Sequence, residues 1–241
     1  MGTRSGKIGS SPSRTSSFRA LPPSPSAPAG SIVDLRKLLA ERFPQPRPRA
    51  QTRISTGLDA LDAATDGGLP KGAITELTSP HVSAGTALLV YHLLRAAERG
   101  RYFMALIDGR DSFDPQPLGN THLRNLLWVR CSKAGEAIKA ADLLLRDGNF
   151  PLVVLDLVLN ASEELRKIPS STWYRLQRLI EPVPAAFLVL TRHSLSSSAQ
   201  VKLVLENRWS LGHLQEEQGI TELQFRVRRV QGGRQEIARA G

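Results

Sequence analysis

The chain has 241 residues and a formal net charge of +10 at pH 7, a length that suffices for one sizeable hydrophobic core or at most two small ones. No apolar run approaches the roughly 18–20 residues of a membrane span, and no apolar stretch typical of a secretory signal follows the first basic residues. The single cysteine, Cys131, excludes an internal disulfide. We therefore expect a cytoplasmic protein that does not bind a membrane, with an amphipathic transit peptide as the alternative for the Ser- and Arg-rich N-terminus.

The positive charge is concentrated at the two ends of the chain. Residues 1–50 carry nine Lys or Arg against two Asp or Glu, and residues 221–241 carry five against two, whereas residues 51–220 balance at 18 of each sign. Basic terminal segments favour contact with nucleic acid or with an acidic protein surface. The alternative is that they only keep the chain soluble.

The first 50 residues divide into a tail and a helix with a linker. Residues 1–30 are dominated by Ser, Pro and Gly and cannot bury enough apolar surface to offset the entropy of ordering, so a disordered basic tail is predicted. Residues 31–50 are predicted to form an amphipathic helix followed by a Pro-rich linker. The apolar face of this helix, which is the candidate partner-binding surface, contains Leu35, Leu38, Leu39 and Phe43. An isolated helix of this length is marginal in water, so the face docks either on another protein or on its own domain.

From residue 51 to residue 241 short apolar runs alternate with amphipathic segments. Helices are predicted over 56–64, 84–99, 134–146 and 171–180, and strands over 73–78, 101–108, 126–130, 152–157 and 185–191. Residues 201–230 look like three further strands with turns near Gly212 and Gly219. This alternation predicts one α/β core domain with a mostly parallel central sheet, helices on both faces and antiparallel strands at the C-terminal end.

Five pieces of this domain resemble the RecA-type ATPase core, a branch of the P-loop NTPase fold. The opening segment reads ISTGLDALD at 54–62 and GGLPKGAITEL at 67–77. The same order continues with Ile107-Asp108 and Asp114-Pro115, then Val153 to Asp156, and then Phe187 to Thr191. Each piece is short, but their order and spacing together are specific to this core. The resemblance covers residues 51–241 and implies a RecA-like sheet.

The segment that would hold phosphate departs from the family pattern. A working phosphate loop reads G-x-x-x-x-G-K-S/T, in which backbone N–H groups and the Lys neutralise the phosphates. The aligned window runs from Ser79 to Thr86, with Ser79 and Ala84 at the glycine positions, Gly85 at the lysine position, and Ser83 between them. Only Thr86 keeps the hydroxyl that would reach Mg²⁺ in a relative. We therefore expect a degenerate nucleotide-binding loop that disfavours ATP and Mg²⁺.

A second departure agrees with the first. The resemblance places Arg110 where RecA-like proteins carry the Glu that orients the attacking water, and a cation cannot act as a general base. Asp156 remains at the position of the Walker B acid, with a role as a buried hydrogen-bonded acid as the alternative. We therefore expect no catalytic residue and no enzyme activity, and leave residual nucleotide binding open. The five histidines show no metal-ligand spacing, so no metal site is predicted.

Among RecA-like proteins the chain most resembles the ImuA family, which is close to SulA-like proteins. This resemblance rests on the apolar N-terminal helix, the TGLDALDAA and GGLPKGAITEL segments, and the degenerate loop. The resemblance implies a non-catalytic accessory protein in SOS-induced DNA repair and translesion synthesis. The implied partners are RecA, a Y-family polymerase-like protein and an error-prone replicative polymerase. An ATP-dependent RecA-type DNA-binding recombination protein and a SulA-like cell-division inhibitor are the alternatives.

Two groups of basic residues are candidates for weak contact with DNA or with a partner. Arg192 and His193 follow the last predicted core strand, near the DNA-binding loop of the family, which is shortened here to residues 194–198. The second group alternates with apolar residues on a C-terminal strand and contains Arg226, Arg228 and Arg229. Such residues could contact phosphates. The alternative is an ordinary edge strand whose solvated charges prevent it from pairing with another chain.

Overall fold

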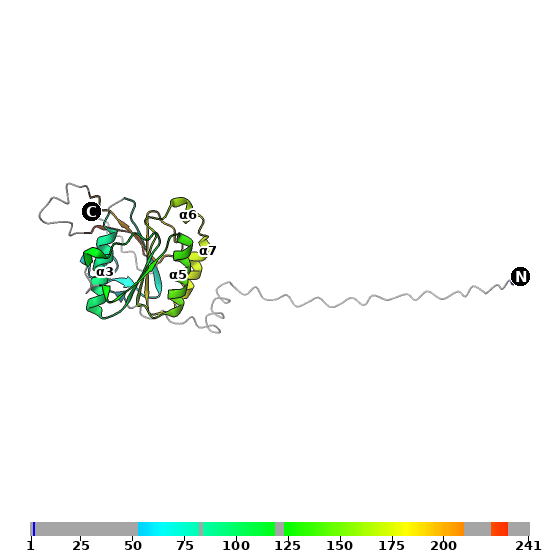
Figure 1. Cartoon of the computed structure of the whole chain (residues 1–241), viewed down its shortest axis with the longest axis horizontal. Helices are drawn as coiled ribbons and strands as arrows, with labels where there is room; N and C mark the ends of the chain where they lie inside the picture. The colour runs from blue at the N-terminus through cyan, green and yellow to red at the C-terminus, as the bar shows by residue number, and fades with distance from the viewer. Residues whose placement is uncertain (1, 3–52, 82–83, 119–122, 210–222, 231–241) are drawn as a thin grey trace, which may run out of the picture. The chain divides into compact units, whose positions relative to one another are not determined.

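The computed structural model describes Gly2 and residues 53–81, 84–118, 123–209 and 223–230. All of its helices and strands belong to the unit Pro48–Gly241 (Figure 1). The predicted tail, the helix with Leu35, Leu38, Leu39 and Phe43, and Ser83 of the phosphate-loop window lie outside the described residues.

A seven-stranded sheet forms the centre of the domain. Its strands run in the order β5-β4-β6-β7-β3-β8-β9. Every neighbouring pair from β5 to β8 is parallel, and β9 pairs antiparallel with β8. The bounds are β3 Ala73–Thr78, β4 Met104–Asp108, β5 Leu126–Arg130, β6 Leu152–Asp156, β7 Ala186–Thr191, β8 Val201–Leu205 and β9 Phe225–Val230. The predicted mostly parallel α/β architecture with an antiparallel C-terminal addition is confirmed.

Helices cover both faces of this sheet. The long helix α3 (Thr86–Gly100) lies on one face, and α5 (Ala134–Asp147) and α7 (Ser170–Ile180) lie on the other (Figure 1). Their apolar sides fill two buried clusters, one containing Leu89 and Leu93 of α3 and the other containing Ile138 of α5 and Trp173 of α7. Because both faces are covered, the central parallel strands are predominantly apolar, as β7 (AFLVLT) is.

Short elements connect this framework. They are the two-stranded ribbon of β1 (Arg53–Ile54) and β2 (Leu69–Pro70), the helices α2 (Asp59–Ala64) and α6 (Ser162–Arg166), and the 3-10 turn Gln116–Leu118.

Three predicted boundaries are wrong by two or three residues, each for a local reason. Helix α2 begins at Asp59 and not at 56, because the Asp62 carboxylate accepts hydrogen bonds from the amide and the hydroxyl of Thr56 and holds that residue in a turn. Helix α3 begins at Thr86, because Gly85 has φ 101°, which is outside the helical region. Strand β4 begins at Met104, because Arg101 adopts φ 51° as α3 ends. Of the three strands predicted over 201–230, the structure has β8 and β9, and residues 210–222 lie outside the described part.

Candidate functional site

A cavity of about 540 Å³ opens at the carboxyl ends of the parallel strands, beside the start of α3. This edge is where parallel α/β sheets ordinarily place a ligand. The cavity is lined by His81, Thr86, Ala87, Val90, Tyr91, Ser112, Phe113, Asp114, Leu118, Asp156, Val158, Leu159 and Arg192. Of the residues predicted for the site, it therefore brings together Thr86, Asp156 and Arg192.

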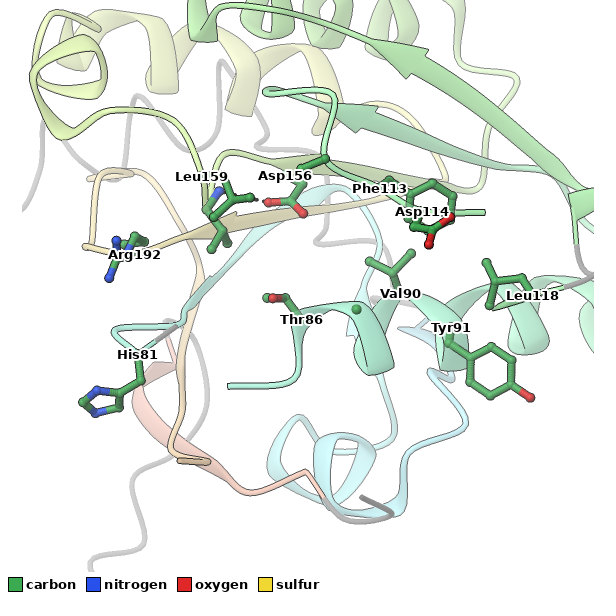
Figure 2. A pocket seen from close by; sticks show the side chains of 13 residues that line it. His81, Thr86, Val90, Tyr91, Phe113, Asp114, Leu118, Asp156, Leu159 and Arg192 are labelled. Atoms are coloured by element: carbon green, nitrogen blue, oxygen red, sulfur yellow. Dashed lines mark hydrogen bonds between the residues drawn. The ribbon is translucent and has the colours of Figure 1, made fainter. Parts of the chain in front are cut away.

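Thr86 and Asp156 face one another across the middle of the cavity (Figure 2). Thr86 is the first residue of α3, and Asp156 is the last residue of β6. The Asp156 carboxylate accepts a hydrogen bond from the Val158 amide at 2.9 Å. The pKa of Asp156 is raised to about 6, mainly by burial. The hydrogen bond from Val158 opposes this shift, and the charge of Asp108 on the neighbouring strand adds to it.

Asp108 organises one wall of the cavity. This buried residue ends β4, and its carboxylate accepts hydrogen bonds from the amides of Ser112 and Phe113, both at 2.7 Å, and from the amide of Arg110 at 3.2 Å. These bonds fold the segment 109–114 so that Phe113 and Asp114 reach the cavity. The sequence signal for this role is an acid at a strand end with a Ser four residues later.

The phosphate-loop window is crowded where a lysine stands in a working loop. Gly85 is buried at φ 101°, and a Cβ atom added to it would lie 2.6 Å from both Leu223 Cδ2 and Trp209 Cη2. The neighbouring Ala84 is fully buried. At the other end of the window, the amide of Ser79 donates to the Thr191 carbonyl at 2.7 Å, which ties the loop to β7. The space next to the helix start is thus filled by two side chains from the C-terminal part of the chain.

Arg110 does not point into the cavity. Its guanidinium donates to the Ser132 carbonyl at 3.0 Å, and the residue is not part of the cavity lining. Arg110 therefore holds the loop after β4 against the loop after β5.

The two ends of the cavity differ in polarity (Figure 2). His81 and Arg192 lie at one end, where the Nε2 atom of His81 accepts a hydrogen bond from Arg208 at 2.9 Å. Val90, Tyr91 and Leu118 lie at the other end together with Asp114, so the cavity offers a largely apolar wall with one acid opposite a basic wall. Sequence reasoning missed His81, which lies at a variable position of the phosphate-loop window, and it missed the apolar wall, whose residues belong to no motif.

The remaining basic candidates lie apart from the cavity. His193 is exposed, and Arg226 and Arg228 are exposed on the edge strand β9. Arg226 forms an ion pair with Glu206, which already occupies its guanidinium. Arg229 belongs to the same strand, but its side chain lies outside the described part.

A buried acid that the sequence did not single out fixes the connection after β7. Glu76, in the middle of β3, is fully buried and accepts hydrogen bonds from the Ser194 hydroxyl and the Ser196 amide, both at 2.8 Å. It also pairs with Lys202 of β8 at 3.1 Å. The segment next to His193 is therefore fastened to the sheet.

Within the described residues, no three His, Cys, Asp or Glu side chains cluster closely enough to hold a metal ion. The helices of that part of the chain are also too short or too polar to span a bilayer.

The sheet order, the covering helices and the cavity at the strand ends define a RecA-like α/β domain. The family model of the RecA N-terminal domain matches residues 44–166, and the chain belongs to this family.

Curated relatives agree over the same region. The chain is 37% identical to protein RecA of Rubrobacter xylanophilus over 109 residues, which are 44% of this chain and 31% of that protein. It is 35% identical over 115 residues to protein RecA of Frankia alni, covering 46% of this chain and 33% of the relative. Protein RecA of Chlorobaculum tepidum is 36% identical over 113 residues, covering 44% and 31%. The match thus spans about a third of the length of these relatives.

Proposed function

We propose that this chain is a non-catalytic RecA-like adapter in SOS-induced DNA repair and translesion synthesis, similar to the ImuA proteins. In this role it holds RecA, a Y-family polymerase-like protein or an error-prone replicative polymerase, and does not hydrolyse ATP. The observation that carries the proposal is the packing of Trp209 and Leu223 against Gly85. Where a phosphate loop presents a flexible cation, this chain has a glycine covered by apolar side chains.

The chemistry of triphosphate binding explains why this difference matters. A lysine at this point neutralises the β and γ phosphates, and removing one such electrostatic group generally costs about 10²-fold or more in rate. Arg110 adds to the loss, since its guanidinium is a cation engaged with Ser132 and cannot orient a water as a carboxylate does. Arg192 lines the cavity, but Figure 2 draws its guanidinium pointing away from Thr86.

A nucleotide titration tests the loss of ATP binding. Fluorescent ATP with Mg²⁺ is titrated with the full chain, with one of the matching RecA proteins as the positive control. We expect no Mg²⁺-dependent binding at micromolar concentration and no hydrolysis, with or without single-stranded DNA. Micromolar binding that is abolished by Thr86→Ala or Asp156→Asn would instead favour the alternative of an ATP-dependent recombination protein.

A reconstruction experiment tests the reason for the loss. Gly85→Lys alone should not restore ATP binding, because the new side chain meets Trp209 and Leu223. The triple variant Gly85→Lys, Trp209→Ala, Leu223→Ala makes room for the lysine and should bind more ATP than the single variant. Restoration by the single variant would show that crowding is not the obstacle.

The adapter role itself is tested by partner capture. Full chain immobilised on beads is incubated with purified RecA and, separately, with each polymerase component. We expect capture that is lost in a Leu38→Asp, Leu39→Asp double variant, since these residues form the apolar face of the predicted N-terminal helix. Unchanged capture by the folded double variant would remove the helix from the proposal.

A further inference from the structure

A second pocket, of about 570 Å³, lies at the amino ends of the parallel strands, whereas the cavity described above lies at their carboxyl ends. Three of its residues lie one or two positions before strands: Lys71 before β3, Tyr102 before β4 and Pro151 before β6. The full lining is Arg53, Ile54, Ser55, Lys71, Ala96, Arg99, Gly100, Tyr102 and Pro151. None of the predicted functional residues belongs to this pocket.

The charged members of this lining are all basic. Arg53, Lys71 and Arg99 line the pocket, and no Asp or Glu does. Arg53 pairs at 3.5 Å with the well exposed carboxylate of Asp66 and donates to the Gly68 carbonyl. Within the described part of the chain, neither Lys71 nor Arg99 makes an ion pair with a carboxylate.

One acid lies near the pocket without lining it. The carboxylate of Asp62 is near Tyr102 and accepts hydrogen bonds from Ser55 and Thr56, so its single charge offsets only part of the charge of the three cations. Burial raises the pKa of Tyr102 to about 12, so its phenol stays neutral at physiological pH, although Arg99 opposes this shift. The pocket therefore concentrates positive charge in a core domain whose residues 51–220 are neutral as a whole.

Arg99 lies close to a glycine of the neighbouring turn. Gly57 has φ 74°, and a Cβ atom added there would lie 2.1 Å from the Nη2 atom of Arg99. The guanidinium thus lies directly against the backbone of the turn before α2. The absence of a side chain at position 57 therefore leaves room for Arg99 beside the pocket.

The pocket combines these cations with an apolar floor. Ile54, Ala96 and Pro151 supply that floor. Tyr102 packs against the core and against Gly100, so no aromatic ring in the lining stands free for a nucleic-acid base to stack on. An anionic ligand with an apolar side chain matches this lining better than a single strand of DNA does.

We propose that the basic pocket binds an acidic peptide segment of a partner protein, with carboxylates at Lys71 and Arg99 and one apolar side chain on the Ile54–Ala96–Pro151 floor. Charge complementarity excludes the N-terminal segment of this chain or of a second copy, since residues 1–50 carry nine basic and two acidic side chains. The site goes beyond the proposed adapter role, because it does not involve the N-terminal helix or the nucleotide cavity.

Fluorescence anisotropy tests the site with a defined probe. A short fluorescein-labelled peptide with one Leu between Glu pairs is titrated with the full chain at ionic strengths of ~50 mM and ~300 mM, where the Debye length differs more than twofold. We expect saturable binding that weakens with salt. The double variant Lys71→Ala, Arg99→Ala should bind about tenfold more weakly or worse, because it removes both cations that pair with the carboxylates of the peptide.

The control removes the same charge elsewhere. Lys139→Ala, Arg166→Ala lowers the net charge by two at exposed positions of α5 and α6, and it should bind the peptide as the unchanged protein does. Equal binding by both double variants, with circular dichroism showing both folded, would overturn the proposal. Two further outcomes overturn it. The first is tighter binding of labelled oligothymidylate that is lost in the Lys71→Ala, Arg99→Ala variant. The second is equal binding of a control peptide in which Gln replaces every Glu.

Should the double variant fail to fold, Arg99→Gln removes the charge and keeps most of the packing, with the same expected direction. Failure of all these variants to change peptide binding would leave the adapter proposal intact, because capture through the N-terminal helix is measured independently.

Discussion

The raised pKa of Asp156 makes a quantitative prediction about stability and pH. The ordinary pKa of an aspartate is 3.8, and in the folded protein the pKa of Asp156 is about 6. Above pH 6 the carboxylate is charged in both states and is less well solvated in the fold. Below pH 3.8 it is protonated in both. The folded state therefore loses stability between these two pH values and stays penalised above them.

Asp156→Asn removes this penalty while keeping an oxygen that can accept the Val158 hydrogen bond. A difference of about two pKa units at 1.36 kcal/mol each gives an upper value of about 3 kcal/mol. Partial exposure of the side chain to water in the cavity reduces this to about 2 kcal/mol. The variant should be more stable than the unchanged protein by that amount at pH 7.5.

Urea unfolding, followed by circular dichroism at pH 3.5, 5 and 7.5, measures the free energy of unfolding of both proteins. The gain should grow from pH 3.5 to pH 7.5, which makes the low-pH measurement an internal control. A gain that does not change with pH would refute an electrostatic cause. A loss of stability at pH 7.5 would mean that Asp156 is stabilised as a carboxylate.

Three further substitutions test other contacts. Gly85→Ala should destabilise the fold by about 2 kcal/mol or more in urea unfolding, because it combines a positive φ with overpacking against Trp209. A change below about 0.5 kcal/mol, the size of an ordinary surface substitution, would contradict the inference that the loop is crowded at Gly85. Glu76→Gln should lower the free energy of unfolding by about 3 kcal/mol, because it leaves Lys202 without its buried partner. It should also speed amide hydrogen exchange at residues 194–196. Unchanged exchange would show that other contacts hold this loop. Arg226→Ala should change the free energy of unfolding by less than about 1 kcal/mol, since its pair with Glu206 is exposed, and a larger loss would give this edge pair a structural role.

The sequence predicted those features that depend on local pattern. Strands β3 and β5 have the predicted bounds, because each is a short apolar run between turn residues. Helix α6 was not predicted, since five residues with two acids carry little periodicity. At the cavity, Thr86 and Asp156 followed from motif spacing. The packing of Leu223 and Trp209 on Gly85 and the bonds from Glu76 to the segment 194–196 join residues more than 100 positions apart, and no local pattern encodes such pairs.

The contact of Trp209 and Leu223 with Gly85 also constrains how this protein can change over generations. A side chain introduced at position 85 gains nothing until the two covering side chains become smaller, and shrinking them first leaves a void that costs stability. Each single step is thus unfavourable, although the combined change could be tolerated. Positions 85, 209 and 223 are therefore mutually dependent, so that a larger residue at position 85 is tolerated only together with smaller residues at the other two.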